Sequence, residues 1–243
     1  MKQTENLCES LKWDTDFFGF KVARITRKAV NSSDMEQILH WAHRNSIRVL
    51  YFAVGTAEMQ TIRLAEANSF RLVDVRITLD QNLDQNTHAL TEDQKEVRIC
   101  QAEDIPLLRA IARESHHDTR FYQDPNFPRE LCDLLYETWI EKSCKGYADA
   151  VLVAETGNGL AGYLSCHLLG DGQGKIGLMA IAKRSQGMGV GTKIVRGCLA
   201  WFSSRGVRRV SVVTQGRNYQ AQRLYQKLGF RTAAIDLWYH KWL

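Results

Sequence analysis

The sequence predicts an α/β protein built of two domains. Short segments rich in β-branched and aromatic residues alternate along the chain with longer segments whose apolar residues recur at helical spacing. A polar, aperiodic segment at 80–94 separates a first set of these elements from a second. We therefore expect a smaller N-terminal α/β domain at 1–93 and a larger domain at 94–243.

The composition excludes disordered, collagen-like and membrane-spanning classes of protein. Of the 243 residues, 44% are hydrophobic and 24% are charged, which is typical of a chain that buries a core. The longest apolar stretch, 49–54, is far shorter than the about 20 residues that cross a bilayer. Residues 1–6 contain no apolar signal region. We expect a soluble, cytoplasmic protein that does not insert into a membrane.

Charge and cysteine usage narrow the possible partners. The net charge is +5, and the basic residues are dispersed rather than gathered into a stripe, so we expect no nucleic-acid partner. The six cysteines are scattered without a Cys-x-x-Cys pair, and the histidines form no His-x-x-x-His ladder. We therefore expect reduced thiols and no metal.

Strands and helices alternate in the predicted first domain. The strands are short and β-branched or aromatic, and the helices carry an apolar face. Ser33, with Glu36 three residues later, forms a capping box that would begin the first helix. The predicted strands are 20–27, 48–54 and 72–79, and the predicted helices are 33–45 and 61–68.

The predicted second domain is richer in strands. Gly157-Asn158-Gly159 is a strong hairpin turn signal between two of them. Segment 116–128 holds two of the three prolines and is predicted to be an irregular loop. The predicted strands are 97–100, 150–154, 162–168, 175–181, 207–214 and 232–242, and the predicted helices are 104–114, 130–142, 189–205 and 218–228.

The two halves of the chain share a pattern of strand, glycine turn, helix and strand. Arg48 precedes Arg209 by 161 residues, and Arg63 precedes Arg223 by 160, so one gap would reconcile the two offsets. Chance similarity and true duplication both explain this pattern. If the chain is duplicated, the first half kept the framework without the glycine loop described next.

A glycine-rich loop between strand 175–181 and helix 189–205 indicates an anion site. Gly187, Gly189 and Gly191 alternate here. Glycines let the backbone approach phosphate oxygens, and a helix start offers unpaired N–H groups with partial positive charge. The spacing fits neither a nucleotide-triphosphatase loop nor a dinucleotide fingerprint. A plain turn between strand and helix is the structural alternative.

Two motifs, about 30 residues apart with a predicted strand between them, resemble the GCN5-related N-acetyltransferase (GNAT) superfamily. The motifs are Gln186-x-x-Gly189-x-Gly191 and Asn218-x-x-Ala221-x-x-x-Tyr225-x-x-x-Gly229-Phe230. The resemblance covers roughly 95–243. It implies the GNAT fold, a central mixed and mostly antiparallel sheet flanked by helices. The N-terminal domain would then be a degenerate half of that fold.

The resemblance implies acetyl-CoA as the co-substrate and a set of residues that bind it. The backbone of strand residues 179–181 would pair with pantetheine and offer an N–H to the developing oxyanion. The glycine loop would hold the pyrophosphate. Asn218 would contact the pantetheine arm, although a helix N-cap is an equally good explanation for it. The expected cofactor-binding residues are Met179, Ala180, Ile181, Gln186, Gly187, Met188, Gly189, Val190, Gly191, Thr192 and Asn218.

Tyr225 is the expected general acid. It lies seven positions beyond Asn218, about two helical turns, and therefore on the same helix face. A phenol with a pKa near 10 can protonate a thiolate as the C–S bond breaks. A tyrosine that only packs in the core is the alternative.

The amino end resembles a narrower group, the dTDP-fucosamine acetyltransferases, which carry a comparable N-terminal domain. The similar stretches are 11–19, 69–74 and 119–121, with Ser69 where the pattern has glycine. This resemblance implies Asp74 as a base acting through water, unless it is a plain surface carboxylate. It also implies that Arg120 and Phe121 bind the acceptor, although Arg120 can equally be a solvated surface residue. The alternative bases are Glu114, His116 and His117.

Together these features predict direct acetyl transfer to the 4-amino group of a nucleotide-linked amino-dideoxy sugar, with a small-molecule acceptor. One alternative is a GNAT enzyme for another amine, such as an antibiotic, a polyamine or a peptide N-terminus. The other is a non-catalytic acyl-CoA-binding regulatory module. Whether the chain forms a homodimer stays open.

Overall fold

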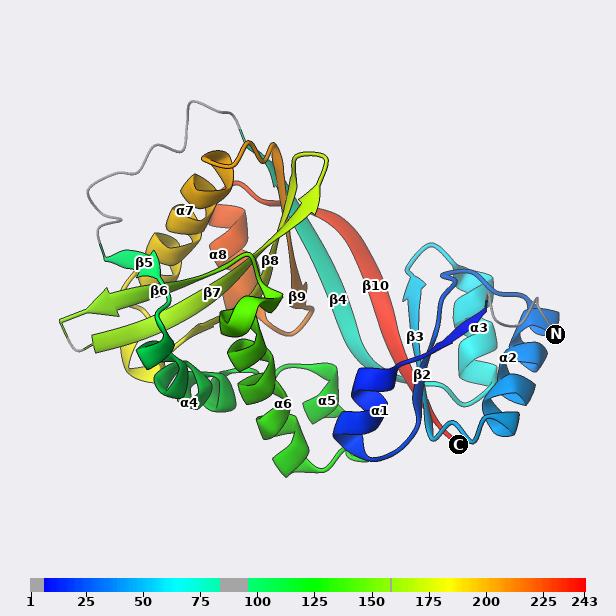
Figure 1. The fold of residues 1–243 in the computed structure, drawn as a ribbon. Coiled ribbons are helices and arrows are strands. Elements are labelled where there is room, and N and C mark those ends of the chain that lie inside the picture. Colours follow the sequence, from blue (N-terminus) through cyan, green and yellow to red (C-terminus); the bar gives the residue numbers. More distant parts are fainter. Residues whose placement is uncertain (1–6, 84–95, 158) are drawn as a thin grey trace. The chain divides into compact units, whose positions relative to one another are not determined.

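The computed structural model describes residues 7–83, 96–157 and 159–243 (Figure 1). The chain forms two compact units. The first contains Met1–Ile77, Gln123–Asn126 and Ala234–Leu243, and the second contains Thr78–Tyr122 and Phe127–Ala233. The boundary predicted near residue 93 lies outside the described residues. The residue ranges of the compact units also differ from those of the predicted domains, because the last residues of the chain return to the first unit.

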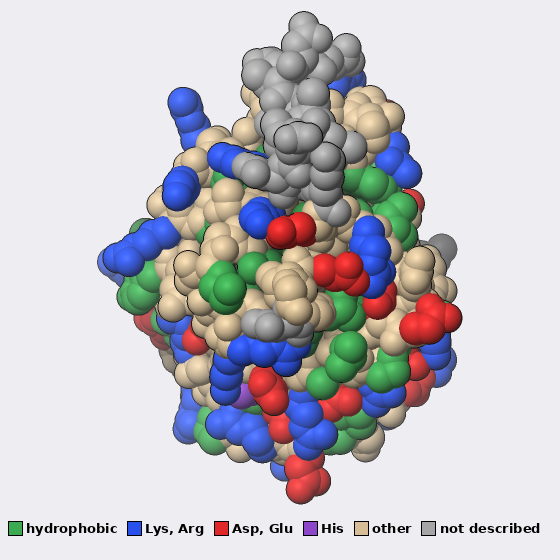
Figure 2. All heavy atoms as spheres, turned by 90° about the vertical axis from the view of Figure 1, so that its left-hand side faces the viewer, with side chains coloured by type: hydrophobic (Ala, Val, Ile, Leu, Met, Phe, Trp, Pro, Cys, Tyr) green, Lys and Arg blue, Asp and Glu red, His purple; other side chains and the backbone are tan. Residues whose placement is uncertain are grey.

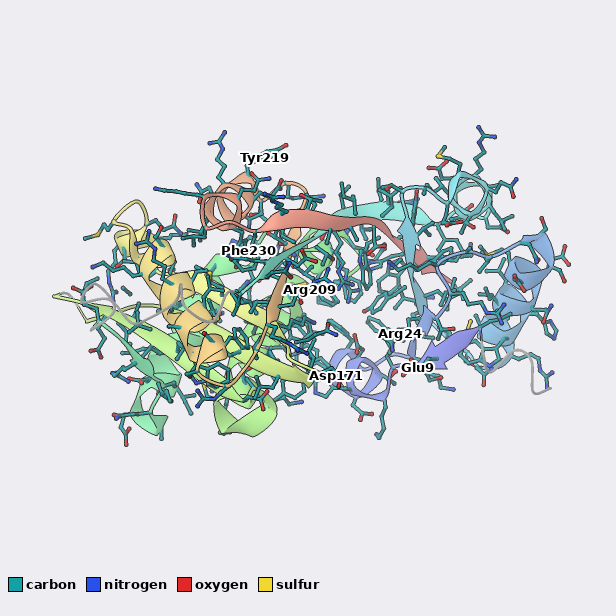
Figure 3. The ribbon with its side chains drawn as sticks, turned by 90° about the horizontal axis from the view of Figure 1, so that it is seen from above. Glu9, Arg24, Asp171, Arg209, Tyr219 and Phe230 are labelled. Carbon is teal, nitrogen blue, oxygen red and sulfur yellow. The ribbon has the colours of Figure 1, made fainter. Side chains whose placement is uncertain are left out.

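The first unit is a small sheet with flanking helices. Its elements are β1 (Cys8–Ser10), α1 (Lys12–Phe18), β2 (Val22–Ile25), α2 (Ser32–Arg44), β3 (Val49–Gly55), α3 (Met59–Ala67), the start of β4 (Arg71–Asn82) and the end of β10 (Arg231–Trp242). The strand order begins β1-β2-β3-β10, with only β2 and β3 parallel among these pairs. Glu9 and Arg24 face each other across β1 and β2 in an ion pair of 2.8 Å (Figure 3).

The core of the first unit follows the alternation of β3. Leu50, Phe52 and Val54 are fully buried and pack with Met35 and Ile38 of α2. Successive side chains of a strand point to opposite faces, so these three share the face that the helices cover. Neither β1 nor α1 was predicted from the sequence, because both are too short for a periodic pattern to register.

The predicted capping box of α2 is wrong by two residues. The N-cap is Asn31, whose Oδ1 accepts from the Asp34 backbone N–H at 2.9 Å. The Asp34 carboxylate in turn accepts from the Asn31 N–H at 3.1 Å. Asparagine is as good an N-cap as serine, and the helix begins at Ser32, so Asn31 is the residue that can reach the third backbone N–H.

The second unit has a larger sheet, ordered β4-β9-β8-β7-β6-β5. The β5–β8 strands pair antiparallel and β8 pairs parallel with β9, so the sheet is mixed and mostly antiparallel, as predicted. The further elements are β5 (Val97–Ile99), α4 (Ile105–Ser115), α5 (Arg120–Gln123), α6 (Arg129–Lys142), β6 (Ala150–Thr156), β7 (Gly159–Gly170), β8 (Gln173–Ile181), α7 (Val190–Ser203), β9 (Arg209–Gln215) and α8 (Tyr219–Lys227).

Helices cover both faces of this sheet (Figure 1). The sulfur of Cys166 on β7 lies 3.5 Å from the sulfur of Cys198 on α7. Tyr163, of opposite parity on β7, contacts His116 at the end of α4. Because alternate residues of a strand face opposite ways, α7 lies on one face and α4 on the other. The predicted α/β class, a sheet flanked by helices, is confirmed.

Part of segment 116–128, predicted to be irregular, is a short helix. The Tyr122 N–H donates to the Thr119 carbonyl at 3.0 Å, and α5 follows Thr119. Phe121 on α5 is buried against Phe127 and Trp139, with ring centroids 5.3 and 6.1 Å away. Burial of this ring stabilises a single helical turn that the local sequence does not favour.

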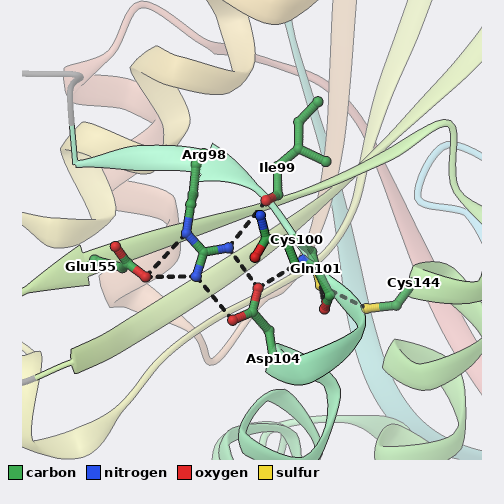
Figure 4. Close-up of polar contacts among 7 residues, drawn as sticks. All are labelled: Arg98, Ile99, Cys100, Gln101, Asp104, Cys144 and Glu155. Carbon is green, nitrogen blue, oxygen red and sulfur yellow. Dashed lines mark hydrogen bonds and ion pairs between the residues drawn. The ribbon is translucent and has the colours of Figure 1, made fainter.

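An ion-pair cluster fixes β5 at the sheet edge (Figure 4). Arg98 contacts Asp104 at 2.7 Å and Glu155 on β6 at 2.6 Å. The hydrogen bond from Arg98 lowers the pKa of the Asp104 carboxyl, so this carboxylate stays charged at neutral pH. Close by, the sulfurs of Cys100 and Cys144 lie 3.6 Å apart, and all six cysteines are free thiols. Figure 2 shows acidic and basic side chains interspersed on its face, which agrees with the dispersed charge of the sequence.

The internal repeat is more regular in the structure than in the sequence. β9 begins at 209 where β3 begins at 49, and the same offset of 160 residues relates α8 to α3 and β10 to β4. The paired elements also have equal lengths. No gap is needed, so the gap inferred from the sequence is wrong. The regular spacing favours duplication over chance similarity.

Candidate functional site

The parallel strands β8 and β9 part at the middle of the second unit. Their registered pairs run from Gln173 with Arg209 to Ile176 with Val212, although β8 continues to Ile181. The other edge of β8 stays paired with β7 up to Ile181. Residues 177–181 of β8 therefore lie beside β7 on one edge, and on the other edge they extend past the last registered pair with β9.

Backbone N–H groups of β8 point into this opening. The Ala182 N–H donates to the carbonyl of Ala161 on β7 at 2.8 Å. Successive N–H groups of a strand point to opposite edges, so the N–H groups of Ile181 and Met179 point away from β7. An extended ligand lying along this edge of β8 would find donors at these two residues.

The glycine loop joins the end of β8 to α7. Gly187 and Gly189 both have φ of +78°, a conformation that only glycine adopts readily. Gly189 is the N-cap of α7, and no side chain caps this helix. At the matching place in the first unit, Asn31 caps α2 with its own side chain. No side chain therefore accepts from the first N–H groups of α7, which is the arrangement expected of an anion site.

The remaining loop residues differ in exposure and in contacts. Gln186 Nε2 donates to the Ile181 carbonyl at 3.2 Å and so ties the loop to the end of β8. The Met188 side chain is exposed, whereas Val190 is buried in the core. A Cβ at Gly191 would lie 3.2 Å from Leu224 on α8, which shows how closely the start of α7 packs there.

Tyr225 lies on α8 against β8. Its hydroxyl donates to the sulfur of Met179 at 3.3 Å, and its ring packs edge-on against Phe230 at 5.5 Å. Burial raises the pKa of Tyr225, so the phenol keeps its proton at neutral pH. Tyr225, from the second motif, is thus in direct contact with Met179, on the strand that leads into the glycine loop.

Asn218 has a structural role in the same helix. It is the N-cap of α8, and its Oδ1 accepts from the Ala221 N–H at 3.0 Å. The N-cap interpretation is confirmed, and a pantetheine contact stays a prediction. The neighbouring Tyr219 is exposed at the start of α8 (Figure 3).

The two residues predicted to bind the acceptor differ in exposure. Phe121 is 2% exposed, so its ring packs in the core and offers almost no surface to a ligand. The Arg120 guanidinium carbon lies 4.2 Å from the centre of that ring, in a cation–π contact. Arg120 is therefore the better acceptor-binding candidate of the two.

The predicted bases have contrasting environments. Asp74 is a buried carboxyl on β4 in the first unit, not the surface carboxylate that was its alternative. In the second unit, His116 Nε2 lies 2.8 Å from the Tyr163 hydroxyl, and burial lowers the pKa of His116 to about 4. Glu114 and His117 are exposed. Only His116 among these three alternatives is held against the sheet.

Sequence reasoning missed a buried polar cluster in the first unit. Asp124 Oδ2 lies 2.7 Å from His240 Nδ1 and accepts from Trp242 Nε1 at 2.8 Å. Its Oδ1 accepts from the Asn126 backbone and side chain at 3.1 and 2.9 Å. The partners on β10 are more than a hundred residues away, so no local signal pairs them with Asp124.

Two features that the described residues lack bear on the predicted function. Within the described residues, no three or more His, Cys, Asp and Glu side chains form a group suited to a metal ion. Among the helices described, none combines the length and apolar character needed to span a bilayer.

Comparison with known proteins identifies the family of this chain. Residues 109–230 match the model of the acetyltransferase (GNAT) family. The chain is 26% identical over 240 residues to the dTDP-fucosamine acetyltransferase of Escherichia coli O6:H1, covering 96% of this chain and 97% of that protein. It is 27% identical over 139 residues to the spore coat polysaccharide biosynthesis protein SpsD of Bacillus subtilis, covering 57% of this chain and 48% of that protein.

A solved structure shows the same fold. The GCN5-related N-acetyltransferase of Sphaerobacter thermophilus superimposes with a TM-score of 0.70 over 97% of this chain and 76% of that one, at 14% identity. At this identity the likeness is one of fold. It extends over nearly the whole chain, so the N-terminal elements are part of the shared architecture.

Proposed function

The chain belongs to the acetyltransferase (GNAT) family, and on that premise we propose that it acetylates the 4-amino group of a nucleotide-linked amino-dideoxy sugar similar to dTDP-fucosamine. The chain is an acetyl-CoA-dependent N-acetyltransferase. The substrate proposal is supported by the two named relatives. One is a dTDP-fucosamine acetyltransferase, and the other is a polysaccharide biosynthesis protein.

The donor would bind along the open edge of β8 and across the start of α7. Beyond Ile176 this edge of β8 lies past the registered pairing with β9, and it would offer an extended arm N–H donors at Met179 and Ile181. The uncapped N-terminus of α7, reached through Gly187 and Gly189, suits the two charges of a pyrophosphate. The residues present therefore fit acetyl-CoA, which supplies an activated acetyl group as a thioester.

The observation that carries the mechanism is the contact of Tyr225 with Met179. The amine nitrogen attacks the thioester carbonyl carbon, forming a C–N bond, and the C–S bond then breaks. A backbone N–H of β8 stabilises the negative charge that develops on the carbonyl oxygen. Tyr225 gives its phenolic proton to the departing sulfur. In the structure, the same hydroxyl donates to the thioether sulfur of Met179 at 3.3 Å.

The acceptor amine must also lose a proton. We assign this step to Asp74, acting through a water molecule, with His116 as the alternative. A carboxylate can accept the amine proton, and the side chain of Asp74 is buried on β4. Arg120 would contact the nucleotide diphosphate, since a guanidinium binds phosphate in a bidentate manner.

The decisive experiment measures thiol release from acetyl-CoA with a panel of amines. The panel contains dTDP-4-amino-4,6-dideoxygalactose, its UDP counterpart, a polyamine, an aminoglycoside and a peptide N-terminus. We expect the highest kcat/KM with the dTDP sugar. A higher value with any non-sugar amine would replace the acceptor. Acetyl-CoA binding without turnover on any amine would favour a regulatory binding module.

A further inference from the structure

Relative to its partner β7, β8 contains one extra residue just before residues 179–181. In its pairing with β7, Leu164 is opposite Met179 and Cys166 is opposite Ile176, so two steps on β7 match three on β8. The extra residue forms a bulge at Gly177 and Leu178. A bulge changes the direction in which the following backbone groups point.

A buried hydroxyl occupies this bulge. Ser165 of β7 is fully buried, and its Oγ accepts from the Leu178 N–H at 2.8 Å. The bulge interrupts the ladder of backbone hydrogen bonds at this part-buried N–H, and leaving such a donor unpaired is costly. Ser165 therefore provides the bulge with a side-chain acceptor.

Two neighbours complete the arrangement. A Cβ at Gly177 would lie 2.5 Å from Ser165 Oγ and 2.6 Å from His167 Nε2, so only glycine lets the hydroxyl sit there. His167 Nε2 itself lies 3.4 Å from Ser165 Oγ. Burial and the nearby Lys175 charge lower the pKa of His167, so the ring is neutral at pH 7 and one nitrogen can accept the Ser165 proton.

The hydrogen bond from Leu178 fixes the edge of β8 to which each following N–H group points. Leu178 and Ala182 both direct their N–H groups to the β7 side, at Ser165 Oγ and the Ala161 carbonyl. The residues of opposite parity between them, Met179 and Ile181, direct theirs to the open edge. If the bulge moved by one residue, Met179 and Ile181 would direct their N–H groups to β7, and the residues next to them would face the open edge.

We propose that Ser165 is a positioning residue for acetyl transfer, which holds the β8 bulge in the one register that aims the Met179 and Ile181 N–H groups at the thioester carbonyl. It acts through Leu178 and touches neither substrate. This inference rests on the part of the proposed function that places the thioester beside β8. It does not depend on which amine is the acceptor.

The test combines kinetics with the spectrum of the bound thioester. Ser165→Ala should lower kcat roughly 10- to 100-fold, somewhat less than the loss of an oxyanion donor itself. The KM for acetyl-CoA should stay within about threefold, because the pyrophosphate loop is untouched. Isotope-edited infrared spectra of acetyl-CoA labelled with ¹³C at the carbonyl should show a lowered C=O frequency on wild-type protein and a frequency near the solution value on the variant.

Ser143→Ala is the matched control. Ser143 is also buried in the second unit, and its Oγ donates to the Trp139 carbonyl at 2.9 Å at the end of α6. It should lose stability without changing kcat or the carbonyl frequency. Ser165→Cys keeps the shape with a weaker acceptor, so it should show the same changes if Ser165→Ala does not fold.

Two outcomes would overturn the inference. A folded Ser165 variant with wild-type kcat and an equally shifted carbonyl would remove the positioning role and leave the proposed function intact. A carbonyl that is unshifted on the wild-type protein would overturn the placement of the thioester, and the role of Ser165 with it.

Discussion

The hydroxyl of Tyr225 points at the sulfur of Met179 across 3.3 Å, although the two residues are 46 positions apart. Tyr225 lies on α8 and Met179 on β8, where β8 leaves β9. A protonated phenol thus already donates to a sulfur atom beside the strand that would hold a thioester. This is the geometry that a general acid for a leaving thiolate needs.

Replacing Tyr225 with phenylalanine tests this role. The substitution removes one hydroxyl and keeps the ring packed on Phe230, so stability should change modestly. Acetyl-CoA should still bind, and kcat should fall roughly 10²- to 10⁴-fold. Steady-state kinetics and a thermal melt on the same protein measure both. Tyr239→Phe, at a buried tyrosine of the first unit, is the control and should leave kcat unchanged. A wild-type kcat with a lowered melting temperature would make Tyr225 a core residue only.

Gly189→Val should abolish acetyl-CoA binding. No atom lies within 4 Å of an added Cβ, so the effect comes from the φ of +78° and from the blocked approach to α7. Gly206→Val is the matched control. Gly206 lies just past the other end of α7, has φ of +73°, and likewise has no atom within 4 Å of an added Cβ. Both variants should lose similar stability, and only Gly189→Val should lose the calorimetric signal of CoA. Unchanged CoA affinity in folded Gly189→Val would remove the loop from the donor site.

Asp74→Asn should slow turnover at neutral pH while acetyl-CoA binds normally. The amide has the same size but cannot accept the amine proton, so kcat should fall roughly 10²-fold or more. Asp236→Asn is the control, because Asp236 is an equally buried carboxylate of the first unit, paired with Lys28 at 2.6 Å. Full turnover in Asp74→Asn would exclude Asp74 as the base. His116→Gln would then be the variant to measure.

The carboxylate of Asp124 should stabilise the first unit in a pH-dependent way. Burial alone would raise its pKa, but hydrogen bonds from His240, Trp242 and Asn126 outweigh burial and lower it to about 2. A lowered pKa stabilises the folded state at pH values above the unfolded pKa, and the effect is lost as pH falls toward 2. The shift corresponds to about 2 kcal/mol.

Urea denaturation of wild type and Asp124→Asn between pH 7 and pH 2.5 measures this contribution. The difference in unfolding free energy should be constant above about pH 5 and should shrink below pH 4. Asp16→Asn, at an exposed ion pair with Lys12, should show little difference at any pH. A difference for Asp124→Asn that stays constant to the lowest pH would assign the effect to packing rather than charge.

Local patterns predicted most of the elements. The strands and long helices were placed within a few residues, because alternation and helical spacing depend only on neighbours in the chain. The glycine loop was predicted for the same reason, since its conformation follows from residues 187–191 themselves. The short helix α5 was missed because burial of Phe121, not local preference, stabilises it.

The sequence by itself determined the family, the place of the glycine loop and the identity of Tyr225 as a candidate acid. Only the tertiary structure decided which partner each side chain meets: Met179 for Tyr225, Leu178 for Ser165 and His240 for Asp124. Periodicity assigns a residue to a face of its element, but a partner on another element depends on sheet register and on the bulge in β8. These are set by the packing of the whole unit, which no stretch of sequence contains alone.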